Sequence, residues 1–103
     1  MPDTVTHKWS FFTNHARVLI CIARAPDIRL REIGDTVGIT ERAAHRIVNE
    51  LADAGYVNRE RIGRRNRYTV QSSLPLPDPL APEQRIGDLP IDDLLALLQR
   101  RSS

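Results

Sequence analysis

Two apolar patterns with helical spacing, joined by a short turn at Gly38, constrain the fold of this chain more than any other feature of its sequence. Leu30, Ile33 and Val37 stand at positions i, i+3 and i+7, which places them on one face of a short helix. Gly38 predicts the end of that helix, because glycine adopts the left-handed backbone conformation without strain. A second helix is expected to begin after Thr40, whose side-chain oxygen can accept from the first N–H groups of a helix.

The second helix, expected over residues 41–54, has two unlike faces. One face repeats apolar residues with helical spacing, namely Ala44, Ile47, Val48 and Leu51. The other face is polar and carries Arg42, His45, Arg46, Asn49 and Asp53. The apolar face is expected to pack on the core of the domain, which leaves the polar face exposed.

Further elements are expected on both sides of this pair. A helix over residues 15–25 precedes it, and Pro26 ends that helix. Because residues 18–23 are apolar without interruption, this helix is expected to be covered on more than one side. After the pair, strand-like runs at residues 56–62 and 67–70 flank a short connector that contains Gly63 and Asn66, which predicts a β-hairpin.

The charge of the chain is concentrated on this hairpin. The net charge is only +2, because residues 40–70 hold seven Arg against four acidic residues while residues 71–103 hold three bases against five acids. Within residues 59–67 five Arg stand against one Glu. This concentration favours a polyanionic partner, and a merely solvated charged hairpin is the alternative.

Length and composition exclude several classes of protein. A chain of 103 residues suits one domain, and Cys21, its single cysteine, excludes an intramolecular disulfide. Cys21 lies in an apolar helix, which favours a buried, unreactive thiol over the alternative of a redox sensor. The three histidines are scattered, and the sequence contains neither a Gly-rich phosphate loop nor a convincing nucleophile–base–acid set. No metal, no cofactor and no enzymatic activity are therefore expected.

The sequence also predicts where the chain resides. The longest apolar run has six residues, whereas a membrane span needs roughly 20. No signal-peptide pattern opens the chain, so a cytoplasmic protein without a membrane segment is expected.

Both ends of the chain carry apolar residues that one small domain has too little core to bury. Residues 1–12 form an aromatic arm, residues 71–82 a Pro-rich linker, and residues 83–103 a region whose Leu residues follow helical spacing. A homodimer is expected to bury these surfaces, although the C-terminal helix can instead pack on its own domain. The residues expected at the dimer interface are Trp9, Phe12, Leu94, Leu95 and Leu98.

The order of elements resembles a known family. Residues 13–70 are similar to the winged helix-turn-helix domains of MarR-like and ArsR-like bacterial regulators. The resemblance rests on the run Ile33-Gly34 to Val37-Gly38-Ile39-Thr40 leading into Ile47-Val48 and Leu51, and on the step from Leu51 through Gly55-Tyr56-Val57 into the Arg-rich hairpin. It implies an α+β fold with a three-helix core, a β-hairpin wing and, in this chain, a C-terminal amphipathic helix.

The resemblance also implies a function, namely sequence-specific binding of double-stranded DNA by a homodimeric transcriptional regulator at a palindromic operator. By this resemblance the residues that read bases in the major groove are Arg42, Ala43, His45 and Arg46. Those expected on the DNA backbone, or on the minor groove through the wing, are Thr40, Asn49, Arg61, Arg64, Arg65 and Arg67. Arg59 and Arg61 lie further back on the hairpin and are expected to touch phosphates or to pair with Glu60.

Two other functions remain open at this level. The hairpin and the Leu-rich helix can instead form a protein–protein interaction module, or the basic surface can bind RNA. The excess of Arg on the hairpin favours nucleic acid over a protein partner. The sequence does not indicate a small-molecule effector.

Overall fold

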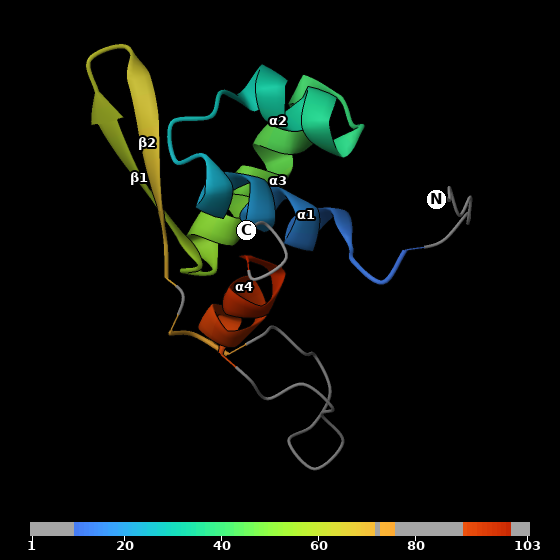
Figure 1. The fold of residues 1–103 in the computed structure, drawn as a ribbon. Coiled ribbons are helices and arrows are strands. Elements are labelled where there is room, and N and C mark those ends of the chain that lie inside the picture. The colour runs from blue at the N-terminus through green and yellow to red at the C-terminus, as the bar shows by residue number, and fades with distance from the viewer. Residues whose placement is uncertain (1–9, 72, 76–89, 100–103) are drawn as a thin grey trace.

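The computed structural model of the chain describes residues 10–71, 73–75 and 90–99. Within these residues the elements follow one another as α1 (Asn14–Arg24), α2 (Leu30–Val37), α3 (Glu41–Asp53), β1 (Val57–Ile62), β2 (Arg65–Val70) and α4 (Ile91–Gln99) (Figure 1). Three helices, an antiparallel hairpin and a further helix confirm the expected α+β winged helix.

The helix boundaries follow the sequence signals closely. Thr13 caps α1 by accepting from the backbone N–H of Ala16 at 3.2 Å, and Thr40 caps α3 by accepting from that of Ala43 at 3.0 Å. The second strand is confirmed, but its predicted start at residue 67 was wrong: β2 begins at Arg65. The turn therefore shortens to Gly63 and Arg64, and Gly63 takes the positive φ of 64° that a tight hairpin turn requires.

The turn between α2 and α3 depends on two glycines. Gly38 has a φ of 85°, and its N–H and that of Ile39 donate to the carbonyl oxygen of Gly34 at 2.8 and 2.9 Å. A Cβ on Gly34 would lie 2.7 Å from the carbonyl oxygen of Ile39. The start of α3 is therefore held against α2 at a distance that only a glycine permits.

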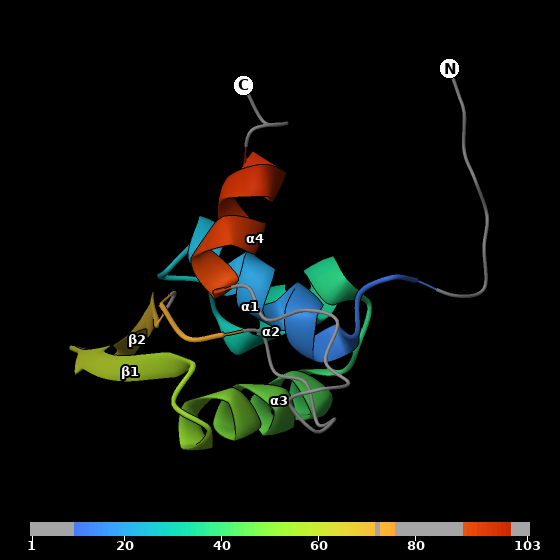
Figure 2. The same cartoon turned by 90° about the horizontal axis from the view of Figure 1, so that it is seen from below.

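The core surrounds α1. Buried side chains from α1, α2, α3, β1, β2 and α4 form one apolar cluster, and Figure 2 shows α3 and α4 on opposite sides of α1. Its fully buried larger members are Val18, Ile22, Ile33, Ile47, Val48, Val57 and Ile91. The coverage of α1 on more than one side agrees with its uninterrupted apolar run. Cys21, expected to be buried, is only half-buried at the margin of this cluster.

The helix α4 packs on its own domain. Ile91 is 0% exposed and Leu95 is 9% exposed within the common core, whereas Leu94 and Leu98 are half-buried. Leu97, which the helical spacing did not single out, is 57% exposed. The intramolecular contact left open by the sequence is thus present, and it leaves an apolar strip on the outer side of α4.

The described residues just after β2 lie against the domain and against the start of α4. The N–H of Gln71 donates to the Tyr56 carbonyl at 2.9 Å, and the Tyr56 hydroxyl donates to the Pro75 carbonyl at 3.1 Å. Pro75 also forms an isolated antiparallel β-bridge with Pro90. Beside this bridge, the N–H of Ile91 donates to the Leu74 carbonyl. Residues 71 and 73–75 of the expected linker are thus fixed against the domain. Other parts of the expected segments lie outside the described residues. They are residues 72 and 76–82 of the linker, residues 83–89 and 100–103 of the expected C-terminal region, and Trp9 in the expected arm.

Candidate nucleic-acid interface

The exposed face of α3 brings together most of the residues expected to meet DNA. They line a shallow groove of about 520 Å³ that runs along this face. The expected residues in this groove are Thr40, Arg42, Ala43, His45, Arg46 and Asn49. Thr40, Arg42, His45 and Arg46 are exposed, and Ala43 and Asn49 are half-buried, so the face offers two guanidinium groups around a small alanine.

Glu50 lines the same groove and places an acidic group beside these arginines. Its carboxylate contacts the Arg46 guanidinium at 3.4 Å, one helical turn back, and the His15 Nε2 of α1 at 2.6 Å. Because an ionised carboxylate only accepts hydrogen bonds, His15 is the donor. This hydrogen bond, and to a smaller extent the charge of Arg46, hold the pKa of Glu50 below its usual range. Sequence reasoning missed this contact, because 35 residues separate Glu50 from His15.

Asn49 connects α3 to the hairpin. Arg59 donates from Nη1 to the Asn49 side-chain oxygen at 2.8 Å, and the Asn49 amide nitrogen lies 3.4 Å from the His45 Nε2. Asn49 was expected on the DNA backbone, yet its oxygen is occupied by a residue of the same chain. Arg59 was expected either to touch phosphates or to pair with Glu60, and no contact between Arg59 and Glu60 is among those found in the described residues.

The strand register explains why Arg59 and Glu60 are separated. Arg59 pairs with Tyr68, and Glu60 pairs with Arg67. Successive side chains of a strand point to opposite faces, so Arg59 shares the face of the buried Tyr68 while Glu60 and Arg67 lie on the other.

The same alternation divides the arginines expected at the tip of the wing. Arg61 lies on the face of Arg59, and its Nε donates to the Gly63 carbonyl at 3.2 Å. Arg65 and Arg67 lie on the opposite face, and Arg67 is 3.8 Å from the Asp27 carboxylate in the loop before α2. Arg64 occupies the turn itself. The wing therefore presents arginines on two faces and at its tip, and all of them are exposed.

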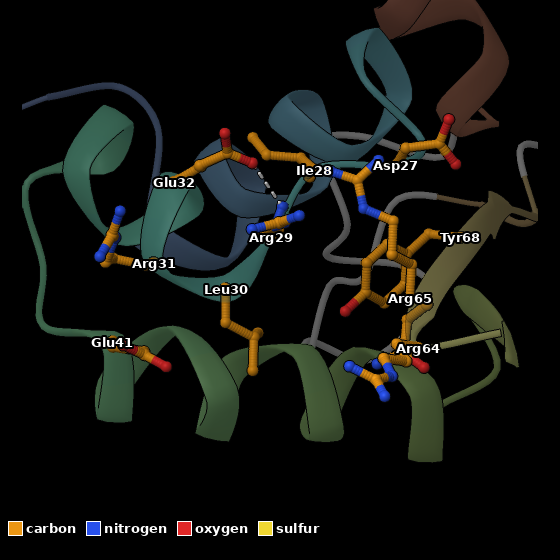
Figure 3. Close-up of a pocket in the computed structure, with 11 residues that line it drawn as sticks. Asp27, Ile28, Arg29, Leu30, Arg31, Glu32, Glu41, Arg64, Arg65 and Tyr68 are labelled. Carbon is orange, nitrogen blue, oxygen red and sulfur yellow. Dashed lines mark hydrogen bonds between the residues drawn. The ribbon is translucent and has the colours of Figure 1, made fainter. Parts of the chain in front are cut away.

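A second groove, of about 620 Å³, separates the wing from the start of α2 (Figure 3). Arg64 and Arg65 line it from the hairpin, and Arg29 and Arg31 line it from the segment that opens α2. Its acidic residues are Asp27, Glu32 and Glu41. Glu32 accepts from the Arg29 backbone N–H at 2.8 Å and thus helps to cap the start of α2. Arg29 and Arg31 were not among the residues expected to meet DNA. Their alternate positions beside the start of a helix nevertheless indicate that both side chains are exposed.

Two other kinds of functional feature are absent from the residues that the structure describes. No helix there is long and apolar enough to cross a membrane. Nor do the described residues contain a group of three His, Cys, Asp or Glu side chains arranged to hold a metal ion.

Three features define the winged helix-turn-helix class. They are a tight turn that requires Gly34, an α3 with two arginines on its exposed face, and an Arg-rich hairpin. Comparison with protein families agrees with this assignment. The sequence profile of the MarR family matches residues 13–67, more than half of the chain, and the protein belongs to that family. The three helices and the hairpin described above are thus the winged helix-turn-helix region of a MarR-family member.

A curated relative occurs in an archaeon. The chain is 33% identical over 63 residues to an uncharacterized protein of Methanocaldococcus jannaschii. The match covers 60% of this chain but only 13% of that relative. The similarity therefore says nothing of the remainder of the larger protein.

Proposed function

We propose that this protein is a sequence-specific transcriptional regulator that places α3 in the major groove of double-stranded DNA. The observation that carries the proposal is the exposed groove of α3, where Arg42, Ala43, His45 and Arg46 lie together beside an Arg-rich hairpin. A major groove admits a helix whose outer face carries such groups, because base edges present acceptors, donors and methyl groups there.

Each residue of this face has a chemically defined role in the proposal. Arg42 and Arg46 each offer a fork of N–H donors to O6 and N7 of guanine. The small side chain of Ala43 allows close approach to a thymine methyl group, and His45 offers a ring nitrogen to a base edge. Thr40 accepts from the Ala43 N–H, and its hydroxyl hydrogen is available to donate to a phosphate.

The wing supplies the sequence-independent part of binding. Arg61, Arg64, Arg65 and Arg67 are exposed and neutralise phosphates or enter the adjacent minor groove. The grouping of arginine at the hairpin favours nucleic acid over a protein partner for this element.

We further infer that the regulator is a homodimer on a palindromic site. Leu97 is exposed on the outer side of α4, with the half-buried Leu94 and Leu98 near it, and Phe12 is 36% exposed before α1. Leu95 packs inside its own core and supports this surface from within. A second copy related by a two-fold axis buries the same strip on both subunits.

Selection of bound duplexes from a random pool tests the function directly. We expect enrichment of an inverted repeat, with affinity that falls steeply as salt rises. Arg46→Ala tests the base-reading face, and Arg24→Ala, an exposed arginine at the end of α1, is the matched control. If random and selected duplexes bind equally, binding is not sequence-specific. If no duplex binds even at low salt, the protein-interaction alternative replaces this proposal, and preferential competition by RNA favours the RNA alternative.

A further inference from the structure

The junction between α3 and the hairpin contains a side-chain contact on its exposed side. Arg59 of β1 donates to the Asn49 side-chain oxygen of α3 at 2.8 Å. Both residues lie outside the apolar core, and the chain between them turns at Gly55, whose φ is 87°. The contact therefore fixes how the base of the wing sits relative to the exposed face of α3.

The chemistry of this contact differs from that of the other anchored arginines. Arg46 is held by the Glu50 carboxylate and Arg67 by the Asp27 carboxylate, so their positive charges are partly offset within the chain. Arg59 is held by a neutral amide. Its direction is fixed while its full positive charge is kept, and only one of its five N–H donors is used.

Asn49 is itself oriented from its other side. Its amide nitrogen lies 3.4 Å from the His45 ring, so His45, Asn49 and Arg59 form a row from α3 to β1. The oxygen of Asn49 faces the guanidinium and, as an acceptor, has no favourable contact to make with a phosphate. The oxygen of Asn49 is therefore placed to orient Arg59.

We propose that Arg59 contacts a DNA phosphate at the boundary between α3 and the wing, and that Asn49 is the positioning residue that orients it. This inference rests on the proposed function. An arginine that is already oriented loses less side-chain freedom on binding, so the contact with Asn49 strengthens binding without touching the DNA. It also sets the distance between the major-groove contacts of α3 and the contacts of the hairpin.

A double-mutant cycle on the full-length chain tests the proposal. Affinity for one selected duplex is measured over a salt series for the wild type, Asn49→Ala, Arg59→Ala and the double variant. We expect Arg59→Ala to weaken binding about tenfold, as for one lost hydrogen bond to a charged group, and to reduce the salt slope by about one. Asn49→Ala is expected to weaken binding roughly threefold with an unchanged slope.

Two further results distinguish positioning from a structural role. The double variant is expected to bind as Arg59→Ala alone does, because Asn49 has no effect once the guanidinium is gone. Asn49→Asp keeps an acceptor for Arg59 but adds a negative charge beside the phosphate, so it is expected to weaken binding more than Asn49→Ala. If Asn49 serves only the fold, Asn49→Ala lowers the melting temperature but leaves affinity and salt slope unchanged, and the positioning role fails.

The control is Arg24→Ala, which removes an exposed arginine of α1 and is expected to leave affinity unchanged. Circular dichroism melts compare the folding of all variants. Unchanged affinity and slope in Arg59→Ala overturn the inference and leave the proposed function standing, provided that Arg46→Ala still weakens binding. Additive losses in the double variant overturn the positioning role of Asn49. A wild-type chain that binds no duplex overturns the proposed function itself.

Discussion

Gly34 is a residue whose replacement should affect the fold directly. A Cβ at this position meets the Ile39 carbonyl oxygen at 2.7 Å, and that oxygen belongs to the backbone of the turn before α3. Alanine favours a helix more than glycine does, but here α2 and the turn must move apart to admit it. We expect Gly34→Ala to lower the free energy of unfolding by about 1–3 kcal/mol, as measured by chemical denaturation.

The control for this prediction is Thr36→Ala, at an exposed position of the same helix. It is expected to leave stability unchanged or to raise it slightly, because alanine is the better helix former. A Gly34→Ala variant as stable as the wild type contradicts the close approach of α2 and the turn.

Glu50 links α1 to the basic face of α3, and its titration reports that link. The hydrogen bond from His15 is the main cause of its lowered pKa, with Arg46 contributing less. We expect His15→Ala to raise the pKa of Glu50 toward its ordinary value, and Arg46→Ala to raise it by a smaller amount. Carbon-13 NMR titration of the side-chain carboxyl measures both changes.

The sign of the effect on stability follows from the direction of the shift. Because the pKa of Glu50 is lower in the folded state, its contribution is present above the ordinary carboxyl pKa and is lost as the pH falls through the lowered value. The carboxylate is exposed, so the effect on stability is small and the NMR titration is the decisive measurement. An identical Glu50 titration in the wild type and in His15→Ala refutes the link.

Arg46 tests base reading within α3. We expect Arg46→Ala to cost about 1–3 kcal/mol of binding free energy and to relax the preference at one base position. Comparison of the sequences selected by the wild type and by the variant provides the measurement. A uniform loss over all duplexes identifies a phosphate contact instead.

At the scale of elements, the role proposed for the wing depends on its charge. Arg64 in the turn and Arg65 at the start of β2 are both exposed. Replacing both with Ala is expected to weaken binding to all duplexes and to reduce the salt slope by about two. Arg24→Ala again serves as the control. An unchanged slope excludes the wing tip from the phosphate contacts.

The elements differ in how far the sequence alone predicts them. The helices α1 and α3 were located to within one residue, because caps, apolar spacing and stop residues are local signals. The start of β2 was missed, because Arg65 and Asn66 are polar and carry no strand signal of their own. Their place in the strand comes from pairing with Ile62 and Arg61.

The candidate site was predicted only in part, because only some of its residues are grouped by a local pattern in the sequence. Helical spacing groups Arg42, His45 and Arg46 on one face, and the structure keeps them there. The contacts of Asn49 with Arg59 and of Glu50 with His15 depend on how α3 packs against β1 and α1. A linear sequence contains no local signal for such pairs, so the roles of these residues emerge only from the tertiary structure.

At the scale of the whole molecule, α4 shows how one apolar pattern can serve two surfaces. Ile91 and Leu95 complete the core of their own domain, while Leu97 remains exposed on the outer side. Because the helix is anchored to the domain by the first pair, a partner bound on its outer side is held at a fixed position relative to α3. This rigid connection is what a dimer needs in order to match two half-sites.

We therefore expect the wild type to sediment as a dimer at micromolar concentration and to bind half-sites whose centres are about 34–36 Å apart. Leu97→Glu places a charge on the exposed strip without disturbing the core, so it is expected to yield a folded monomer that binds a full site more weakly than the wild type. Thr36→Glu adds the same charge on α2 and should remain dimeric. A monomeric wild type, or a dimeric Leu97→Glu variant, shows that α4 does not form the interface, because a carboxylate cannot be buried there without a partner for its charge.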